Sequence, residues 1–508
     1  MCWNNRSKDR CVYLAAFSAI FIILFVFFSR VQPILVLDSD DWTFLAFSRE
    51  ALPAVGAWNP SRVLPEILTP AVGAVAAHVV EPILGDYLKA ITVTYAFAVA
   101  AMILVYLICF SRVLSKVCRL GAVQNMIVTA MFLAVHFWVL RGGYEDNSYL
   151  FHARNLTCYF FYTIPTLLCA SLVLIFEVDP DAWGRASVTG KGLLLLAAYL
   201  AIFSNVFSSI VIAAYAGVVL LQKLLTGGIG KGSFKKLWTV LKEGVFFVGI
   251  ILVWLTSFLF ELTGGRADAV GLDHADGDQS AVFSTLAQSL GSMNKHFCLF
   301  VLAGCLFAVV ILVLSLRKKD KDGHVAFYGP RFFRFAAAAV VTTVYQMLLC
   351  GATGLTHYLM FGDVLITIFF FALMALFTVV LYVLAEVPKV GVLLPLALCV
   401  AVSFCNTRDN TFRESNYHDG PSAVTATVAE DMYRQLMDAQ EQGLTQAVVK
   451  VPVFDDPYNW PLPTYIGDVM ARTLYEHGQL KWPMKVTIEL DPERNELLGM
   501  EMPAGKNR

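Results

Sequence analysis

The feature that most constrains this chain is the repetition of apolar runs of about 20 residues along most of its length. A helix of that length matches the hydrocarbon thickness of a bilayer. The composition agrees, since 57% of the 508 residues are hydrophobic, 15% are charged and the mean hydropathy is +0.64. Soluble domains are about 45–50% apolar and about 25% charged. The sequence therefore predicts an all-α polytopic membrane protein.

Hydropathy predicts about eleven transmembrane helices. Nine of them lie near 11–29, 89–110, 123–140, 158–176, 245–262, 297–316, 335–349, 364–385 and 390–404, and two share the run 193–221. The run 193–221 is too long for one untilted span and contains Asn205, so one long tilted helix competes with a hairpin that turns near Asn205. Basic segments flank the run on both sides, which favours the hairpin, because two crossings return the chain to one side of the membrane.

Lysine and arginine are concentrated in alternate loops. The basic segments contain Arg6, Lys8 and Arg10; Arg112, Lys116 and Arg119; Lys223, Lys231, Lys235, Lys236 and Lys242; and Arg317, Lys318, Lys319 and Lys321. The positive-inside rule places these segments and the N-terminus in the cytoplasm. We therefore expect a multi-pass plasma-membrane protein with an extracytoplasmic C-terminus. No small-residue cleavage site follows the first apolar run, so it is expected to be an uncleaved span.

The chain changes character near residue 406. Residues 1–405 form the predicted transmembrane domain, and residues 406–508 are more polar. Helix signals at 423–442 and 466–477 alternate with strand signals at 447–454 and 484–489, so we expect a small extracytoplasmic α/β module. In the first exterior loop, the amphipathic pieces 42–55 and 62–80 are expected to form interfacial helices.

Three carboxylates, Asp38, Asp40 and Asp41, come shortly after the first apolar run. Carboxylates are costly in hydrocarbon, so this acidic cluster must lie at the water interface or in a polar cavity. A carboxylate there could deprotonate a hydroxyl while a cation holds a phosphate leaving group. We predict Asp40 and Asp41 as the catalytic pair, with Asp38 as helper or bystander. The alternative for Asp40 and Asp41 is a helix cap.

Further polar residues fall on the same predicted membrane face. The predicted substrate-binding residues are Arg62, His152, Arg154 and His357, in addition to Asp38, and the same face carries Glu145, Asp146, Asn205 and Asp363. Arginine suits phosphate because its guanidinium offers paired donors and keeps its charge. Alternatively, Arg62 could reach lipid headgroups, and His152 and Arg154 could anchor a span that re-enters the membrane.

Several other kinds of site are not indicated. The sequence contains no P-loop, GxGxxG, HExxH or CxxC motif, and its 11 cysteines are scattered. The net charge of -1 provides no basic field for nucleic acid. No metal site is predicted, although Asp38, Asp40 and Asp41 could hold a divalent ion through their oxygen atoms.

The motif Asp40-Asp41-Trp42 after one apolar span resembles the GT-C class of integral-membrane glycosyltransferases. With the later segment from Trp58 to Arg62 (WNPSR), it is more narrowly similar to bacterial glucosyltransferase-type proteins. The segments Asn459-Trp460-Pro461 and Tyr465-Ile466-Gly467-Asp468 resemble the tail of bacterial relatives.

This resemblance implies transfer of a sugar from a polyprenyl-phosphate donor to a cell-envelope glycan or lipid acceptor on the exterior face. It implies that Asp40 or Asp41 is the general base and that Arg62 contacts phosphate or acceptor. The chain departs from the family in its late exterior loop, where an arginine is expected and His357 is the only strongly basic residue.

Two other classes of function compete. A transporter or flippase of an envelope precursor would often show internal pseudo-symmetry and ionisable residues at mid-membrane. No repeat is evident in this sequence and the charges collect at one face, which favours an interfacial enzyme. A non-catalytic scaffold that binds a partner through its C-terminal module would leave the acidic cluster unexplained.

Overall fold

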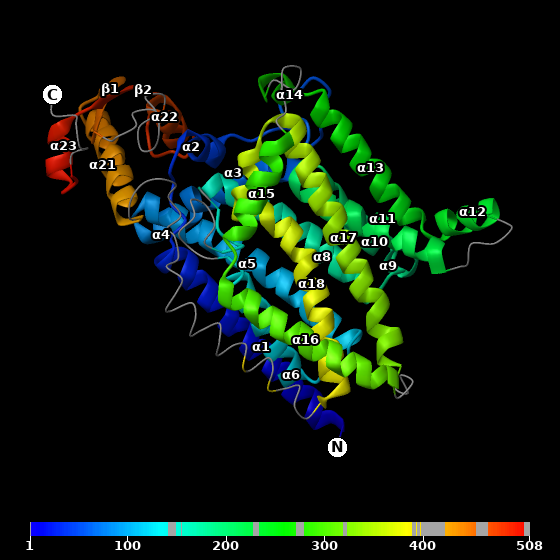
Figure 1. Ribbon diagram of the computed structural model, residues 1–508. Coiled ribbons are helices and arrows are strands. Elements are labelled where there is room, and N and C mark those ends of the chain that lie inside the picture. The colour runs from blue at the N-terminus through cyan, green and yellow to red at the C-terminus, as the bar shows by residue number, and fades with distance from the viewer. Residues whose placement is uncertain are drawn as a thin grey trace.

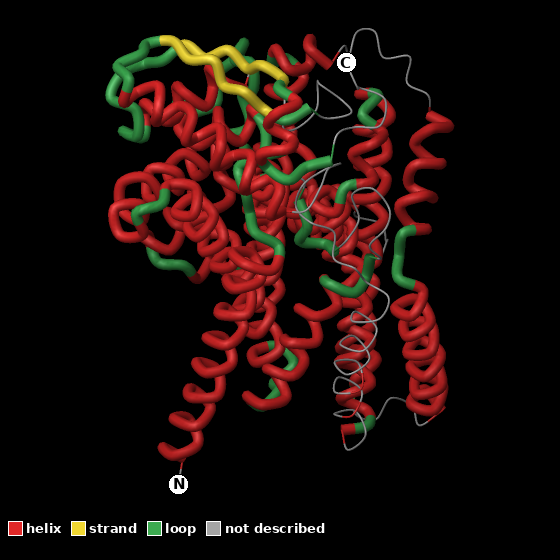
Figure 2. The backbone as a smooth tube through the Cα atoms, turned by 90° about the vertical axis from the view of Figure 1, so that its left-hand side faces the viewer, coloured by secondary structure: helices red, strands yellow, loops and turns green. Residues whose placement is uncertain are grey.

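The computed structural model describes residues 2–140, 149–153, 155–226, 233–270, 279–317, 323–388, 393, 397, 422–453 and 466–501. Helices dominate these ranges, and the two described strands lie at the end of the molecule away from the N-terminus (Figures 1 and 2). The predicted all-α architecture with a small mixed module is therefore present. Which side of a membrane each end faces stays a prediction.

Nine helical segments of the described chain are long and apolar enough to cross a membrane. They are Ser7–Val31, Val63–Leu84, Tyr87–Lys116, Leu156–Val178, Val206–Thr226, Val245–Leu262, Lys295–Arg317, His324–Thr353 and Gly362–Glu386. Two shorter apolar helices, Ala122–His136 and Val188–Ile202, also match predicted spans. The expected span at 390–404 lies, apart from residues 393 and 397, outside the described residues. A multi-pass membrane protein is supported, and the count of eleven crossings stays a prediction.

The elements follow one another with few long gaps. In the first half they are α1 (Cys2–Val26), η1 (Phe27–Val31), α2 (Ser39–Ala46), α3 (Val63–Val75), η2 (Ala76–Val80), α4 (Glu81–Leu84), α5 (Tyr87–Lys116), α6 (Ala122–His136), α7 (Leu156–Cys158), η3 (Tyr159–Thr163), α8 (Ile164–Val178), α9 (Ala182–Arg185) and α10 (Val188–Ile202). The second half contains α11 (Val206–Thr226), α12 (Ser233–Glu243), α13 (Val245–Leu262), α14 (Gly265–Val270), α15 (Gln279–Gly291), α16 (Lys295–Arg317), α17 (His324–Thr353), η4 (Thr356–Met360) and α18 (Gly362–Glu386).

The helices differ sharply in how much of their surface the protein covers. In the most apolar window of the segment Leu156–Val178, 89% of the residues are buried, and the corresponding share is 78% for α18. The shares are 17% for α13 and 11% for α16, although both helices are strongly apolar. A helix that is apolar all round but bare suits contact with lipid. The structure thus has a central pair of helices, α8 and α18, and an apolar periphery.

The predicted break near Asn205 is confirmed. Helix α10 ends at Ile202 and α11 begins at Val206. The Asn205 carboxamide stabilises this break, because its Oδ1 accepts a hydrogen bond from the Phe207 backbone N–H at 2.7 Å and its Nδ2 donates to the Phe161 carbonyl at 3.0 Å. The interruption of the long apolar run therefore has a local cause in one side chain.

The loop predicted to be the first exterior one differs from its prediction. Of the expected piece 42–55 only residues 42–46 are helical, because the helix begins earlier, at Ser39 after its cap at Asp38, and ends at Ala46. The second piece is a continuous helical segment, Val63–Leu84, that is long enough to span a membrane rather than only to lie at its surface. In Figure 1, α2, α3 and α4 all lie at the end of the bundle that carries the C-terminal module.

The C-terminal elements match the predicted alternation. They are α21 (Ser422–Glu441), β1 (Gln446–Val451), α22 (Ile466–Glu476), β2 (Lys485–Leu490) and α23 (Pro492–Leu497). The strands are parallel, with Val449 opposite Ile488, and a parallel pair needs a crossover such as α22. The Thr473 hydroxyl of α22 donates a hydrogen bond to the Trp42 carbonyl of α2, so the module packs on the loop that carries the acidic cluster. The domain boundary at 405 and 406 stays a prediction.

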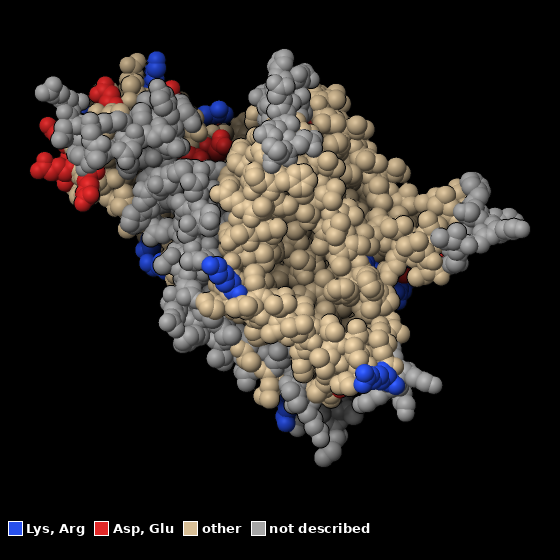
Figure 3. All heavy atoms as spheres, viewed as in Figure 1, with Lys and Arg blue, Asp and Glu red and all other residues tan. Residues whose placement is uncertain are grey.

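The surface separates by charge. In Figure 3 the visible acidic side chains gather at the end that carries α21 and α23, and the bundle surface is mostly uncharged. The N-terminus lies at the opposite end of the bundle from the module (Figure 1). The sides of the membrane that the two ends face stay a prediction.

Candidate functional site

Asp38 is the residue that caps α2. Its Oδ1 accepts hydrogen bonds from the backbone N–H groups of Asp40 and Asp41, at 3.0 and 3.1 Å. This is the usual arrangement of an aspartate at a helix N-terminus, where backbone donors lack helical partners. Burial and the neighbouring charge of Asp40 raise the pKa of the Asp38 carboxyl group, and the hydrogen bonds act in the opposite direction. The helix cap that the sequence suggested for Asp40 or Asp41 is therefore formed by Asp38, two residues before Asp40.

Asp41 is fully buried. Its Oδ2 accepts a hydrogen bond from the Leu37 backbone N–H at 2.8 Å, and its Oδ1 accepts one from the Thr157 backbone N–H at 2.7 Å. Burial, together with the nearby charge of Asp38, raises the pKa of the Asp41 carboxyl group well above its usual range. Both oxygens are thus used to fix α2 against the start of the helix at Leu156.

Asn155 completes this connection from the other side. Its Nδ2 donates to Asp38 Oδ2 at 2.9 Å, and its Oδ1 accepts from the Cys158 backbone N–H at 2.8 Å. Asp38 and Asn155 therefore each cap their own helix and also bond to each other. The Asn155 carboxamide thereby holds two helix starts together.

Asp40 is the exposed member of the acidic cluster. It shares a face of α2 with Phe44, one turn further on. The Phe44 ring packs on Phe161 at a centroid distance of 4.7 Å, and the Arg62 guanidinium carbon lies 4.9 Å from the centroid of the same Phe161 ring. Reduced hydration raises the pKa of Asp40, while the charge of Arg62 lowers it. Arg62 and the Phe44 side chain of α2 therefore pack on one aromatic ring, and Arg62 is near enough to Asp40 to act on its charge.

Arg62 is buried, with 9% of its surface exposed, and lines a pocket. Within the described ranges its guanidinium donates no hydrogen bond, although Glu66 and Glu261 are near enough to act on its charge. Those two carboxylates have other partners: Glu66 pairs with Arg49 at 3.3 Å, and Glu261 accepts a hydrogen bond from the Ser61 hydroxyl. The donors of Arg62 are therefore free to bind an anion.

Asn59, three residues before Arg62, shows the same property. It is 4% exposed, and neither its Nδ2 nor its Oδ1 has a hydrogen-bond partner among the described residues. Buried polar groups are nearly always paired, and an unpaired one costs about 1–3 kcal/mol. Two unsatisfied polar side chains in one short loop are the pattern expected where a ligand supplies the missing partners.

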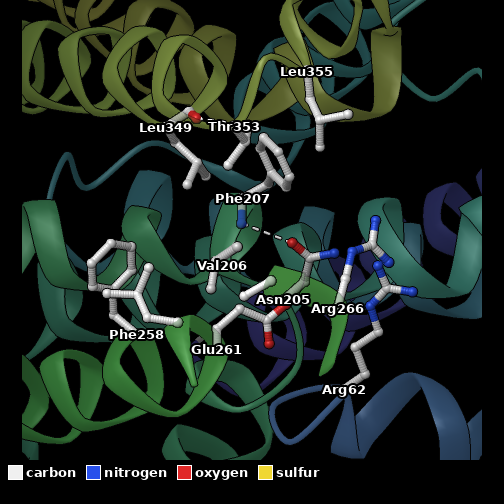
Figure 4. A pocket seen from close by; sticks show the side chains of 12 residues that line it. Arg62, Asn205, Val206, Phe207, Phe258, Glu261, Arg266, Leu349, Thr353 and Leu355 are labelled. Carbon is white, nitrogen blue, oxygen red and sulfur yellow. Dashed lines mark hydrogen bonds between the residues drawn. The ribbon is translucent and has the colours of Figure 1, made fainter. Parts of the chain in front are cut away.

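The pocket is formed where five segments meet. Its lining residues are Arg62, Asn205, Val206, Phe207, Phe258, Glu261, Leu262, Arg266, Ala267, Leu349, Thr353 and Leu355. Figure 4 shows Arg62, Arg266 and Asn205 on one side, with the largely apolar wall of Leu349, Thr353 and Leu355 opposite. A cationic side beside an apolar wall can accommodate a phosphate that is attached to an apolar chain.

The other predicted binding residues are placed apart from this pocket. His152 is buried and stacks edge-on with Tyr149 at 5.4 Å, and His357 is exposed beside Tyr358 and Phe361. Arg154, like Glu145 and Asp146, lies outside the described residues. Of the predicted residues outside the acidic cluster, the structure thus brings Arg62 and Asn205 to one pocket.

Several site residues were not predicted. Arg49, Asn59, Glu66, Glu261 and Asn155 all contribute partners or unsatisfied groups around Arg62 and Asp38. Glu66 and Glu261 carried a signal that was available, because a carboxylate inside an apolar helical run is costly and needs a reason. No group of three or more His, Cys, Asp or Glu side chains in the described chain is arranged to hold a metal ion.

Comparison with known proteins finds no matching family model, no similar curated protein and no similar solved structure.

Proposed function

We propose that this protein is a membrane glycosyltransferase of the GT-C type. It would move a sugar from a polyprenyl-phosphate donor to a cell-envelope glycan or lipid acceptor on the exterior face of the plasma membrane. The observation that carries the proposal is the buried Arg62 guanidinium, which has no hydrogen-bond partner among the described residues and lines a pocket close to the exposed carboxylate of Asp40. A guanidinium can bind a phosphate leaving group, and a carboxylate can accept the proton of an attacking hydroxyl.

The reaction assigns one task to each group. The acceptor hydroxyl oxygen forms a bond to the anomeric carbon, the bond from that carbon to the phosphate oxygen breaks, and the hydroxyl proton passes to Asp40. Arg62 balances the charge of the departing polyprenyl phosphate through paired N–H donors. Arg266 and Asn205 line the same pocket and can bind further phosphate or sugar oxygens.

This proposal sharpens the predicted catalytic pair. Asp41 uses both carboxylate oxygens on backbone donors in the interior, so we assign it, with Asp38 and Asn155, to positioning α2. Asp40 is left as the general base. A raised pKa suits this role because a base works best when its pKa approaches the operating pH.

The test is transfer by the purified full-length chain in lipid bilayers, with a panel of polyprenyl-phosphate hexoses as donors. Release of polyprenyl phosphate is measured for the wild type, for Asp40→Asn and for Glu50→Gln, an exposed acidic residue of the same loop. We expect Asp40→Asn to lower the rate about 10²–10⁴-fold and Glu50→Gln to leave it unchanged. Full activity in Asp40→Asn would rule out the proposed base. Movement of the intact donor across the bilayer without release of polyprenyl phosphate would favour the transporter or flippase instead.

A further inference from the structure

Helix α12 (Ser233–Glu243) has no place in the proposed reaction. It joins α11 to α13, and those two helices line the pocket at their other ends, with Val206 and Phe207 on α11 and Glu261 on α13. The 21 residues from Val206 to Thr226 correspond to about 30 Å of helix, which is the thickness of a bilayer core. Figure 1 shows α12 projecting sideways from the bundle at the far ends of α11 and α13.

The sequence of α12 is strongly amphipathic. By helical periodicity, Leu237, Trp238 and Leu241 share one face, and Thr239, Lys242 and Glu243 occupy the other. The apolar face is bare, because Leu237 is 40% exposed and Trp238 is 64% exposed. Val240, at the edge of this face, is buried. An amphipathic helix whose apolar face is open to the surroundings suits the headgroup region of a membrane.

The direction of α12 is set by close packing. A Cβ atom added at Gly244, between α12 and α13, would collide with the Leu220 side chain of α11 and would come within 3.0 Å of the Val240 carbonyl oxygen. The Leu220 side chain of α11 therefore occupies the space beside Gly244. This contact holds α12 at an angle to the two helices that it connects. A helix attached to two spans in this way lies at the membrane surface.

We propose that α12 binds the headgroups of anionic phospholipids in the leaflet at this end of the bundle. Tryptophan favours the interface between acyl chains and headgroups, and lysines on the opposite face can reach lipid phosphates. The helix carries three lysines and one glutamate, so its charge complements an anionic surface. Each lysine near such a surface contributes roughly fivefold in affinity. This inference does not depend on the proposed glycosyl transfer.

The experiment uses the full-length protein in bilayers of phosphatidylglycerol and phosphatidylcholine, with brominated acyl chains on one lipid at a time. Bromine quenches tryptophan fluorescence at short range, and subtracting a Trp238→Phe sample isolates Trp238 from the other tryptophans. We expect stronger quenching of Trp238 by brominated phosphatidylglycerol than by brominated phosphatidylcholine at equal bromine content. Replacing Lys235 and Lys236 by Gln should remove that preference, lowering the phosphatidylglycerol-to-phosphatidylcholine ratio at least about fivefold.

The matched control replaces Lys481 and Lys485 by Gln. Both are exposed lysines of the C-terminal module, and the preference at Trp238 should survive this change. Equal quenching by the two lipids in the wild type would overturn the proposal, and so would a preference that persists in the Lys235→Gln/Lys236→Gln variant. Absence of quenching by either lipid would overturn it as well, because Trp238 would then be covered by protein.

Discussion

Two clusters of charged side chains, each with a buried member, lie at opposite ends of the bundle, and they differ in whether their side-chain hydrogen bonds are satisfied. At one end Glu177 of α8 accepts hydrogen bonds from Arg331 Nε at 3.0 Å, from Arg334 Nη1 at 2.6 Å and from the Tyr215 hydroxyl at 2.9 Å. Arg334 also donates to Gln222 Oε1 at 2.9 Å. We call this group the closed cluster.

At the other end, the side chains of Arg62 and Asn59 have neighbours but no hydrogen-bond partners among the described residues. We call this group the open cluster. From Arg334 to Thr353, which lines the pocket, α17 runs for about 28 Å. Both clusters place charge in an apolar bundle at considerable cost. In the closed cluster, ion pairs and hydrogen bonds within the protein offset this desolvation cost. In the open cluster, a bound ligand would have to offset it. The closed cluster is therefore expected to stabilise the fold and the open cluster to bind a ligand.

The largest expected effect comes from breaking the closed cluster. Glu177→Ala leaves two arginines without their carboxylate, and removal of one partner of a buried ion pair costs about 3–5 kcal/mol. We expect a marked loss of stability in denaturant titrations of the protein in mixed micelles. Protein that remains folded should transfer sugar at close to the wild-type rate. A normal stability with lost transfer would show that this cluster also acts in function.

Substitution in the open cluster should have the opposite effect, with lost sugar transfer and little change in stability. Arg62→Met removes the proposed phosphate contact, and truncating one partner of a buried charged hydrogen bond costs about 2–5 kcal/mol, so the kcat/KM for donor should fall on the order of a hundredfold. The free energy of unfolding should change by about 1 kcal/mol, from the lost contact with Phe161. Arg62→Lys is the matched variant and should recover part of the activity, because the charge returns without the paired donors. Wild-type kinetics in Arg62→Met would contradict the assignment.

A third test concerns what holds the module against the open cluster's end of the bundle. His477 of α22 is 4% exposed, and its Nδ1 lies 2.7 Å from the Tyr87 hydroxyl of α5. Burial, aided by the charge of His78, lowers the pKa of His477 to about 4. The unfolded chain therefore binds more protons between pH 4 and pH 6.5, so stability falls as the pH drops through this window.

From pH 7.5 to pH 5 the loss should be about 2 kcal/mol. Thermal unfolding of the full chain at the two pH values measures it, and His477→Gln should reduce the pH dependence. The same substitution at the exposed His296 provides a variant for comparison. An equal pH dependence in the His477→Gln variant would show that another group is responsible.

The smallest expected effect is at Asn155. Asn155→Ala removes a helix cap and the hydrogen bond to Asp38, and loss of a cap costs about 1 kcal/mol. Because α2 then loses one of its fixed contacts, sugar transfer should fall severalfold while the donor KM stays unchanged. Asn155→Asp keeps an acceptor for the cap but places a second charge beside Asp38, so it should not restore activity. Activity above that of Asn155→Ala would argue against the Asp38 contact.

The fold could be predicted from the sequence further than the site could. The length of an apolar run can be read directly from the sequence, so the ranges of α13 and α18 were predicted closely. In the last hundred residues, hydrophobic residues alternate between helical and strand spacing, and this identified β1 and β2. The closed cluster was missed because the predicted span began at residue 335 and left Arg331 and Arg334 outside it, whereas α17 begins at His324. A helix that continues through a charged stretch needs a partner such as Glu177, which hydropathy does not show.

The site was predicted in part. The acidic cluster and Arg62 were identified, and Arg62 does lie near Asp40 in the structure. The division of labour among Asp38, Asp40 and Asp41 was not predictable, because three carboxylates in four residues have the same local signal. What separates them is the position of residues 155–157, more than a hundred residues later, whose backbone and side-chain donors bond to two carboxylates and leave the third exposed.

The hydrogen bond between Thr473 and Trp42 joins residues 431 positions apart. During synthesis α2 emerges among the first elements, and α22 can reach it only after the intervening helices have been made. The helix that carries Asp40 therefore spends most of the protein's assembly with one face uncovered, and late closure of a distant contact is slow because of the entropy of the long loop. The stage of biogenesis that adds α22 would then complete the surroundings of Asp40, and a chain in the membrane that lacks α22 would lack them.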